Sequence, residues 1–429
     1  MLDIKLIRDN PDAARAGALK KHFPERAEAV DRVLALDLAV RELIPRIDGM
    51  RSEQKKASKK LGSLSAEERA VHLDGQKQLK EELHELEEKQ RGLREAIHEA
   101  LLLVPNIPED DVPEGKDDAS NVELRRHGEP PEFDFTPRTH HEIAEAQGWL
   151  DTLRAADISG SRNYMLFGEL AMLQDAVLRL AVDHMVGKGF VLVDPPLLVR
   201  DAAMVGTAFF PGGEEQTYRC DRDGLNLIGT SEVPVTSIHA GEILAEDSLP
   251  KLYVARSVCF RREAGTYGKD TKGLYRVHQF HKVEQVIVDV NDGEQSERHH
   301  EAIVANSEEL LQALDLPYRV VNVCGGDLGV PQAKKFDIEC WMPSRESWGE
   351  THSASRFYDY QARRMSLRYR RSEDKKMAFC HTLNNTVVAS PRILIPLLEI
   401  HQQADGTVKL PQALVPYMGG AKVLGKPLI

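Results

Sequence analysis

Cysteine is scarce in this sequence, and long apolar runs are missing. The five cysteines stand far apart, are odd in number and form no CxxC pair: Cys220, Cys259, Cys324, Cys340 and Cys380. This spacing argues against a disulfide framework and against a zinc knuckle. No stretch reaches the roughly 18 apolar residues of a membrane-spanning helix, and the N-terminus has no apolar signal core. These absences predict a cytoplasmic protein without a membrane partner.

An excess of positive charge and the common phosphate-binding loops are also absent. The 429 residues carry 56 Lys and Arg against 68 Asp and Glu, a formal net charge of −12. Because no overall basic field attracts nucleic acid, any RNA contact must use a local basic surface. Neither GxxxxGK[ST] nor GxGxxG occurs, so phosphate must be bound by other means. The composition, 41% apolar and 29% charged, is that of a globular protein of two or three domains.

The clearest periodicity lies between residues 79 and 100. Alternating steps of four and three form a heptad seam of Leu79, Leu83, Leu86, Gln90, Leu93, Ile97 and Ala100. A looser stripe between about 28 and 58, interrupted by Asp37, contains Val30, Val33, Val40, Ile44 and Ile47. Residues 61–65 break the two stripes, and Ser65 begins a helix-start signal. We predict an antiparallel coiled-coil arm over about 28–100, with a kink or local break at Pro45.

A proline-rich, acidic segment follows the arm and indicates an interdomain linker. It contains Pro105, Pro108 and Pro113. We therefore place an N-terminal domain at 1–112 and a second domain at 113–429. In the second domain, β-type runs such as 252–255 and 283–290 mix with helical patterns such as 166–186 without regular alternation. This texture predicts an α+β fold with a largely antiparallel sheet flanked by helices.

The stretch between Phe260 and Glu284 carries the strongest local chemical signal. It reads FRREAGTYG, then GLYRVHQF, then KVE, so that arginines and a phenylalanine flank a glycine-bearing loop. Such a strand-loop-strand unit can present a guanidinium fork to phosphate and an aromatic face to a base. A hairpin with solvated charges would explain the composition equally well.

FRREAGTYGKDTKGLYRVHQF resembles motif 2 of class II aminoacyl-tRNA synthetases, in the form typical of seryl-tRNA synthetases. Thr230-Ser231-Glu232, HTLNNTVVASPRILIPLLE and the arm occur in that family's order, over nearly the whole chain. The chain is thus similar to the bacterial-type (type 1) seryl family. The resemblance implies a class II catalytic domain behind a coiled-coil arm. It also implies a ligase that activates serine with ATP and transfers it to tRNA(Ser), and to tRNA(Sec).

The resemblance also implies the residues of an ATP site. Arg261 of motif 2 and Arg392 of motif 3 are the expected catalytic residues, which spread charge at the α-phosphate. Glu263 would accept a hydrogen bond from the adenine amino group, and Phe280 would stack on adenine. The other expected ATP contacts are Arg262, Val277, His278, Gln279, Glu350, Thr351, His352 and Ser353.

The segment from Glu350 to Arg356 resembles the family's ExSSxSN pattern, in which the glutamate holds magnesium on ATP. Glu350, with Ser353 as a second candidate, is therefore the expected Mg²⁺ ligand, and no zinc is expected. His352 and Arg356 depart from the serine and asparagine of the pattern. Glu339 is either a further metal carboxylate or a structural residue.

A serine site is implied by the same alignment of motifs. Its expected residues are Thr230, Ser231, Glu232, Arg261, Glu284, Asn384 and Thr386. Glu284 would read the side-chain hydroxyl, and Thr386 stands where the family often has serine. A pocket built for a hydroxyl rejects alanine strongly, because the missing group leaves buried polar atoms unpaired.

Two surfaces are expected to bind macromolecules. A basic stripe near the end of the first arm helix would contact tRNA through Arg51, Lys55, Lys56, Lys59 and Lys60; a solvated helix surface is the alternative. Residues 188–196 resemble motif 1, which implies a homodimer, with internal packing in a monomer as the alternative. Two other functions stay open: a ligase that loads a carrier protein, and a non-catalytic RNA-binding scaffold.

Overall fold

The structure is a computed structural model, and it describes residues 1–60, 65–265 and 273–428. The chain forms two compact units, Met1–Ile107 and Pro108–Ile429, which are described separately below. Four of the residues expected to break the arm, Leu61–Leu64, lie outside the described residues, as do Thr266–Lys272 of the motif 2 resemblance. Among the described residues, no helix combines the length and apolarity needed to span a bilayer.

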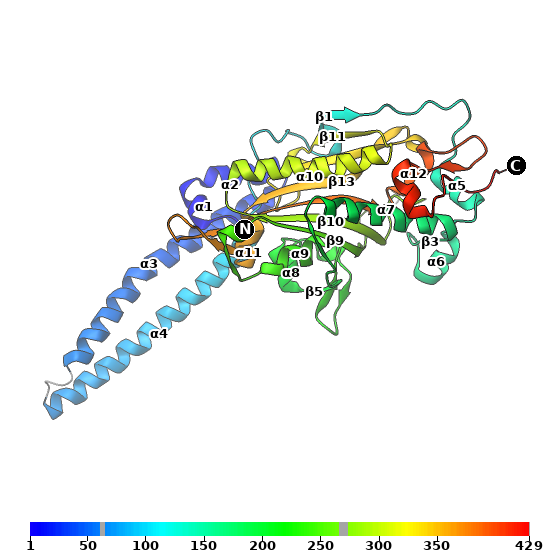
Figure 1. Ribbon diagram of the computed structural model, residues 1–429. Coiled ribbons are helices and arrows are strands. Elements are labelled where there is room, and N and C mark those ends of the chain that lie inside the picture. Colours follow the sequence, from blue (N-terminus) through cyan, green and yellow to red (C-terminus); the bar gives the residue numbers. More distant parts are fainter. Residues whose placement is uncertain (61–64, 266–272, 429) are drawn as a thin grey trace. The chain divides into compact units, whose positions relative to one another are not determined.

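Unit 1 consists of helices: α1 (Ile4–Asp9), α2 (Pro11–Lys20), α3 (Pro24–Lys60) and α4 (Ala66–Leu103). Asn10 caps α2 by accepting a hydrogen bond from the Ala13 amide, and Pro11 occupies the first helical position, where its missing N–H costs nothing. Figure 1 shows α3 and α4 side by side as a long two-helix arm. The predicted coiled-coil arm is therefore confirmed.

Buried side chains between α3 and α4 follow most of the predicted seam. Leu43, Ile47 and Leu83 form a buried cluster against which Leu86 and Leu93 pack. The stripe on α3 differs at one position: Leu43 is 5% exposed, whereas the predicted Ile44 is 37% exposed. A helix of 3.6 residues per turn drifts relative to a strict heptad, and here the seam follows a step of three from Val40.

Two polar features that interrupt the predicted first arm helix are accommodated. Asp37 is buried in the stripe, where Arg8 of α1 donates to both carboxylate oxygens at 2.8 and 2.9 Å. Such a bidentate pair satisfies a charge that burial would otherwise penalise. The helix also continues through Pro45. Of the two predicted outcomes at Pro45, a kink or a local break, the break does not occur, since the helix assignment is continuous from Pro24 to Lys60.

Unit 2 is built on an eight-stranded sheet in the order β1-β11-β12-β13-β16-β10-β9-β4. In chain order the strands are β1 (Val122–His127), β4 (Val191–Val193), β9 (Lys251–Phe260), β10 (Gln279–Asp289), β11 (Tyr318–Asn322), β12 (Lys334–Met342), β13 (Ser347–Tyr358) and β16 (His381–Ser390). Every pairing is antiparallel except that of β4 with β9. The predicted α+β class with a mostly antiparallel sheet is confirmed.

Helices cover both faces of this sheet (Figure 1). The large core lies on one face, beneath α7 (Gly168–Gly187), α10 (Gly293–Ala313) and α12 (Leu394–Ile400). On β10, Val283 and Ile287 point into this core, whereas Val286 packs on the opposite face against Val235 of α9 (Glu232–Thr236). α11 (Tyr360–Met365) contacts β13 and β16, and α8 (Asp201–Gly206) packs against α9 and α11.

Smaller elements surround the sheet. The short helices are α5 (His140–Ala146) and α6 (Leu153–Ser159), and the short strands are β2 (Leu150–Asp151), β3 (Met165–Leu166), β5 (Leu198–Arg200), β6 (Arg219–Cys220), β7 (Leu225–Leu227), β8 (Ile243–Ala245), β14 (Arg368–Arg370), β15 (Met377–Phe379), β17 (Val408–Lys409) and β18 (Val423–Leu424). Turns of 3-10 helix connect several of them, including Pro343–Arg345 between β12 and β13.

Of the β-bulges in this sheet, two decide which side chains reach the cavity described below; others lie in the β1–β11 and β13–β16 pairs. In the β12–β13 pair, Ile338 faces His352 but Glu339 faces Glu350, so Thr351 is an extra residue. In the β10–β16 pair, Val283 faces Val388 but Glu284 faces Thr386, so Val387 is extra. Each insertion reverses which side chains point to which face beyond it.

Candidate active site

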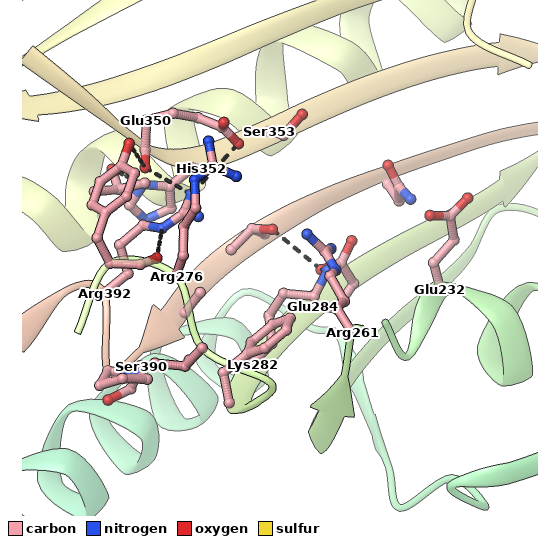
Figure 2. Close-up of a pocket in the computed structure, with 18 of the residues that line it drawn as sticks. Glu232, Arg261, Arg276, Lys282, Glu284, Glu350, His352, Ser353, Ser390 and Arg392 are labelled. Atoms are coloured by element: carbon pink, nitrogen blue, oxygen red, sulfur yellow. Dashed lines mark hydrogen bonds and ion pairs between the residues drawn. The ribbon is translucent and has the colours of Figure 1, made fainter. Parts of the chain in front are cut away.

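A cavity of about 230 Å³ opens on the sheet face that carries α9 and α11. Its walls come mainly from β10, β13 and β16, the segment between β9 and β10, and the start of α9. Figure 2 shows Glu232, Arg261 and Glu284 at one end, and Arg276, Glu350 and Arg392 at the other. Carboxylates and guanidinium groups therefore meet in one concave space, the usual form of a small-molecule site.

Glu284 and Lys282 form a buried ion pair at the first end. The Lys282 Nζ lies 2.6 Å from Glu284 Oε2, and their side chains are 8% and 2% exposed. Thr386, directly opposite Glu284 across the strands, donates from its hydroxyl to the same oxygen at 3.4 Å. Glu284 also lines the cavity, so its carboxylate can accept a hydrogen bond from a ligand hydroxyl or ammonium.

Glu232 lies near Glu284 and is held from behind by Gln361. The Gln361 amide donates to Glu232 Oε1 at 2.8 Å and accepts from the Thr382 hydroxyl at 2.7 Å. Burial, and then the neighbouring charge of Glu284, raise the pKa of Glu232 to about 7. A carboxylate poised near neutrality beside a buried ion pair is typical of binding and catalytic sites.

At the other end, cationic groups surround Glu350. Arg392 lies 3.8 Å from the Glu350 carboxylate and also donates to the Glu350 backbone carbonyl at 2.9 Å. Desolvation opposes ionisation, but Arg392, Lys335, Arg261 and Arg276 together lower the pKa of Glu350 below its ordinary value. This end therefore carries a surplus of positive charge around an ionised carboxylate, as an anionic ligand with a bound cation would require.

The bulges place the expected ligands on the cavity side. Glu350 and Ser353 are three positions apart and would point to opposite faces of a regular strand. Because Thr351 is an extra residue, they pair with Glu339 and Asp337, which share one face of β12. Both consequently line the cavity (Figure 2). The insertion at Val387 does the same for Thr386 and Ala389.

Most of the residues expected from the sequence line this cavity. They are Glu232, Arg261, Glu263, Val277, Phe280, Glu284, Glu350, Thr351, His352, Ser353, Asn384, Thr386 and Arg392. Within it, the Arg261 guanidinium lies over the Phe280 ring, 5.1 Å from its centroid. Burial lowers the pKa of His352 to about 4, and His352 Nε2 bonds the Val387 carbonyl at 3.0 Å. His352 is therefore a neutral wall residue.

Five expected residues lie outside the cavity lining: Thr230, Ser231, Arg262, His278 and Gln279. Thr230 is buried, and its hydroxyl accepts from the Glu232 amide at 3.2 Å. The Arg262 amide donates to the Gln216 carbonyl, and the His278 ring bonds the Arg261 carbonyl at 3.0 Å.

The sequence did not single out Arg276, Lys282 or Gln361 as site residues. Arg276 and Lys282 line the cavity, and Arg276 lies 3.5 Å from Glu263. Both stand within the quoted stretches GLYRVHQF and KVE, so the signal was present. Gln361 comes from α11, far along the chain, and nothing in the local sequence marks it.

Arg356 and Glu339, whose roles were uncertain, have structural partners. Arg356 is buried and pairs with Glu109, which also accepts from the Tyr358 hydroxyl at 2.8 Å. Glu339 lies 2.6 Å from Arg319 on the neighbouring strand. Of the two interpretations of Glu339, the structural one agrees with this pair. Among the described residues, no cluster of three or more His, Cys, Asp or Glu side chains could hold a metal.

The basic stripe on the arm is present on α3. A shallow cleft is lined by Arg51, Gln54, Lys55, Ser58 and Lys59. Arg51 lies 2.8 Å from Glu87 of α4, so part of its charge is neutralised across the helix pair. Lys55, Lys56 and Lys59 are exposed, and the helix assignment extends to Lys60.

Comparisons with known proteins identify the family of the chain. Residues 1–108 match the seryl-tRNA synthetase N-terminal domain, and residues 218–401 match the class II tRNA synthetase core domain (G, H, P, S and T). The serine--tRNA ligase of Deinococcus radiodurans is 48% identical over 428 residues, which cover 100% of both chains.

Solved structures show the same family likeness. A seryl-tRNA synthetase from Pyrococcus horikoshii, complexed with ATP, superimposes with a TM-score of 0.94 at 40% identity, over 99% of both chains. A cytoplasmic serine-tRNA ligase from Naegleria fowleri, in complex with AMP, gives a TM-score of 0.89 at 31% identity, again over 99% of both chains. Fold, site and full-length relatives together show that the chain belongs to the seryl-tRNA synthetase family of class II aminoacyl-tRNA synthetases, and that its activity is that of a serine--tRNA ligase.

Proposed function

We propose that the cavity first joins serine to AMP and then transfers the seryl group to the terminal ribose of tRNA(Ser). The observation that carries this proposal is one cavity with a hydroxyl-reading carboxylate at one end and arginines around an ionised Glu350 at the other. In the first step the serine carboxylate attacks the α-phosphate of ATP and pyrophosphate leaves. In the second, a ribose hydroxyl attacks the acyl carbon and AMP leaves.

The first step needs positioning and charge neutralisation more than a protein base. A serine carboxylate is already ionised near neutral pH, so it is ready to attack. Arg261 and Arg392 approach the cavity from separate elements, and both would neutralise charge that develops on the phosphate. Glu263 and Phe280 would receive the adenine, with Arg262, Val277, His278, Gln279, Thr351 and His352 around the nucleotide.

Magnesium fits the oxygen ligands at the Glu350 end. Glu350 and Ser353 share the cavity face, and Mg²⁺ is commonly bound through one or two protein oxygens together with substrate phosphates. These two residues would hold the ion, which supplies charge stabilisation on the phosphates when bound.

Serine selectivity would come from Glu284, Thr386 and Glu232. Glu284 and Thr386 are paired across β10 and β16 and face the cavity, so they can bond the serine hydroxyl. Glu232 is placed to accept from the ammonium, with Thr230, Ser231 and Asn384 around it. Alanine lacks the hydroxyl and would leave the buried Glu284 carboxylate without a hydrogen bond from the substrate. Sites of this kind favour the hydroxyl-bearing substrate in kcat/KM by a factor on the order of 10⁴ or more.

Serine-dependent ATP–pyrophosphate exchange tests the first step. Wild-type protein should exchange with serine and much less with threonine, alanine or glycine. Arg261→Ala should abolish exchange, whereas Arg298→Ala, an exposed arginine on α10 that bonds Gln295, should leave it unchanged. Full exchange by Arg261→Ala would overturn its proposed role, and no exchange with serine by the wild type would overturn the proposal itself.

We further propose that the N-terminal domain, 1–112, binds tRNA and that 113–429 carries the chemistry. The support is the basic surface of α3, where Arg51, Lys55 and Lys59 line one cleft and Lys56 is exposed, a pattern suited to phosphates along an RNA helix. Lys60 is the fifth residue that the sequence predicts to contribute. Deleting residues 30–100 should spare exchange but remove tRNA charging. Transcripts of tRNA(Ser) and tRNA(Sec) should both be charged by the wild type; failure with tRNA(Sec) alone would restrict the substrate to tRNA(Ser).

A homodimer is proposed from the motif 1 resemblance. The support is an edge strand, β4, whose Val191 and Leu192 are 59% and 50% exposed, next to exposed Val186 at the end of α7. Light scattering should give twice the chain mass of 48.1 kDa, and a Val191→Lys variant should shift it toward the monomer.

The five free cysteines agree with a proposed cytoplasmic location.

A further inference from the structure

The ring of Tyr275 contacts two guanidinium groups at the edge of the active-site cavity. The centre of the Arg392 guanidinium lies 4.4 Å from the ring centroid, and that of Arg345 lies 4.3 Å from it. Both distances are well within the range at which an aromatic ring attracts a cation. Tyr275 and Arg392 line the cavity, whereas Arg345 comes from the turn between β12 and β13.

Arg392 is also fixed by backbone carbonyls on both sides. Its Nε donates to the Tyr275 carbonyl at 3.3 Å, and its Nη1 donates to the Glu350 carbonyl at 2.9 Å. Together with the ring contact, these bonds restrict a side chain that would otherwise lose much rotamer freedom when a ligand binds. The guanidinium is thus held near Glu350 before any ligand arrives.

A buried carboxylate, Glu399 of α12, bonds residues next to both segments that carry this contact, the one with Tyr275 and the one with Arg345. Its Oε1 accepts from the His140 ring at 2.7 Å and from the Ser344 hydroxyl at 2.7 Å, and its Oε2 accepts from the Ser344 amide at 2.9 Å. Ser344 is the neighbour of Arg345. Desolvation opposes ionisation, but the bonds from His140 and Ser344 lower the pKa of Glu399 below its ordinary value.

His140 carries the support from Glu399 to the tyrosine. Its Nδ1 bonds Glu399, and its Nε2 accepts from the Leu274 amide at 3.3 Å, one residue before Tyr275. The backbone at Gly273 packs so closely on this ring that a Cβ there would lie 2.4 Å from Nε2. Gly273 also has a φ of 83°, which favours glycine. Gly273 and Leu274, the two residues before Tyr275, are therefore packed against the His140 ring.

We propose that Tyr275 is a positioning residue for Arg392, held from behind by the Glu399–His140–Ser344 cluster. This inference rests on the proposed function, in which Arg392 neutralises charge on the nucleotide. A guanidinium already stacked and bonded in its working position needs less ordering when ATP binds and when charge develops. Arg345, on the same ring, adds positive potential at the phosphate end of the cavity.

Substitutions that separate the ring from the hydroxyl test this role. Tyr275→Leu removes the ring and should lower kcat/KM for ATP in serine-dependent pyrophosphate exchange about tenfold, the order expected for loss of a well-placed cation–π contact. Tyr275→Phe keeps the ring and should stay within about twofold of the wild type. Because serine binds at the other end of the cavity, the KM for serine should change little in either variant.

A matched variant and a stability measurement exclude a general packing effect. Phe379→Leu removes a ring that lies 4.6 Å beneath Arg363, in β15 and outside the cavity lining, and should leave kcat/KM for ATP unchanged. Thermal unfolding identifies any variant that is simply less stable. If Tyr275→Leu proves unstable, Arg345→Gln is the alternative variant, because it removes the second guanidinium from the Tyr275 ring. It should lower kcat/KM for ATP about threefold.

The outcomes distinguish this inference from the proposed function. A wild type that fails to exchange would defeat the proposed function and leave Tyr275 without a role. An active wild type with Tyr275→Leu equal to Tyr275→Phe would overturn the positioning role alone. Equal rises in the KM for serine and for ATP would likewise count against it, because the contact lies at the nucleotide end.

Discussion

The ionisation of Glu232 gives serine binding a pH dependence that can be measured. Burial, and then the charge of Glu284, raise the pKa of this carboxyl from its ordinary 4.5 to about 7. Below that pH the group is mostly protonated, and above it mostly ionised. Only the ionised form attracts the serine ammonium strongly, so binding should strengthen as the pH rises through about 7.

The magnitude follows from the fraction ionised. With a pKa of about 7, roughly one Glu232 in ten is ionised at about pH 6 and roughly nine in ten at about pH 8. The dissociation constant for serine should therefore fall about tenfold between those pH values. An unshifted carboxylate, already ionised at about pH 6, would give almost no change.

Isothermal titration calorimetry with serine and a non-hydrolysable ATP analogue can measure this effect. Glu232→Gln keeps the shape of the side chain and can still bond Gln361, but it cannot ionise. It should bind serine weakly, and with little change over the same pH range. The same variant tests the link between ionisation and folding. Folding raises the pKa of Glu232 from 4.5 to about 7, so ionisation at higher pH favours the unfolded state. Relative to Glu232→Gln, the wild type should therefore lose about 3 kcal/mol of unfolding free energy as the pH rises from 4.5 to about 7.

Two results would refute this reasoning. One is a wild-type dissociation constant that changes less than about twofold between about pH 6 and about pH 8. The other is an equal pH dependence in Glu232→Gln, which would assign the titration to a different group.

Three further predictions follow from described contacts. Gln361→Leu removes the amide behind Glu232, so it should raise the KM for serine and cost about 2 kcal/mol in urea unfolding; no change in either would contradict the support role. Arg356→Met removes a buried guanidinium from Glu109, which keeps Lys334 at 3.7 Å and the Tyr358 hydroxyl, and should cost about 3 kcal/mol. Adding Glu109→Gln should recover most of this loss, as thermal unfolding of both variants can check. Pro45→Ala restores a backbone donor within α3 and should slow hydrogen exchange in the arm, corresponding to about 1–3 kcal/mol; faster exchange would refute it.

Periodicity and motif chemistry were enough to predict the architecture. The seam from Leu79 to Ala100 required a helical partner, and the irregular mixture of β runs and helices required an α+β unit. Within the arm, however, the sequence favoured Ile44 where the structure buries Leu43. It also gave no sign that Arg8 would neutralise Asp37, because that pair joins residues 29 positions apart.

The candidate site was predicted in part. Residues inside recognisable motifs, such as Arg261 and Glu284, do meet in one cavity. Residues that act through a distant partner were invisible: Gln361 becomes meaningful only when α11 lies beside Glu232. Regular strand alternation would place Glu350 and Ser353 on opposite faces. The extra residue between them puts both on one face, and nothing in the amino-acid composition reveals it.

That extra residue, Thr351, has a wider consequence for how this protein can vary. Its deletion would reverse the face of each later position of the strand: Ser353 would turn toward the core, and Ala354, now interior, would turn away from it. Nucleotide binding thus depends on the number of residues in β13 as well as on their identities. A β13 that lacks Thr351 but keeps Glu350 and Ser353 would no longer place both on the cavity side. Conservative substitutions that keep the strand length would retain this arrangement.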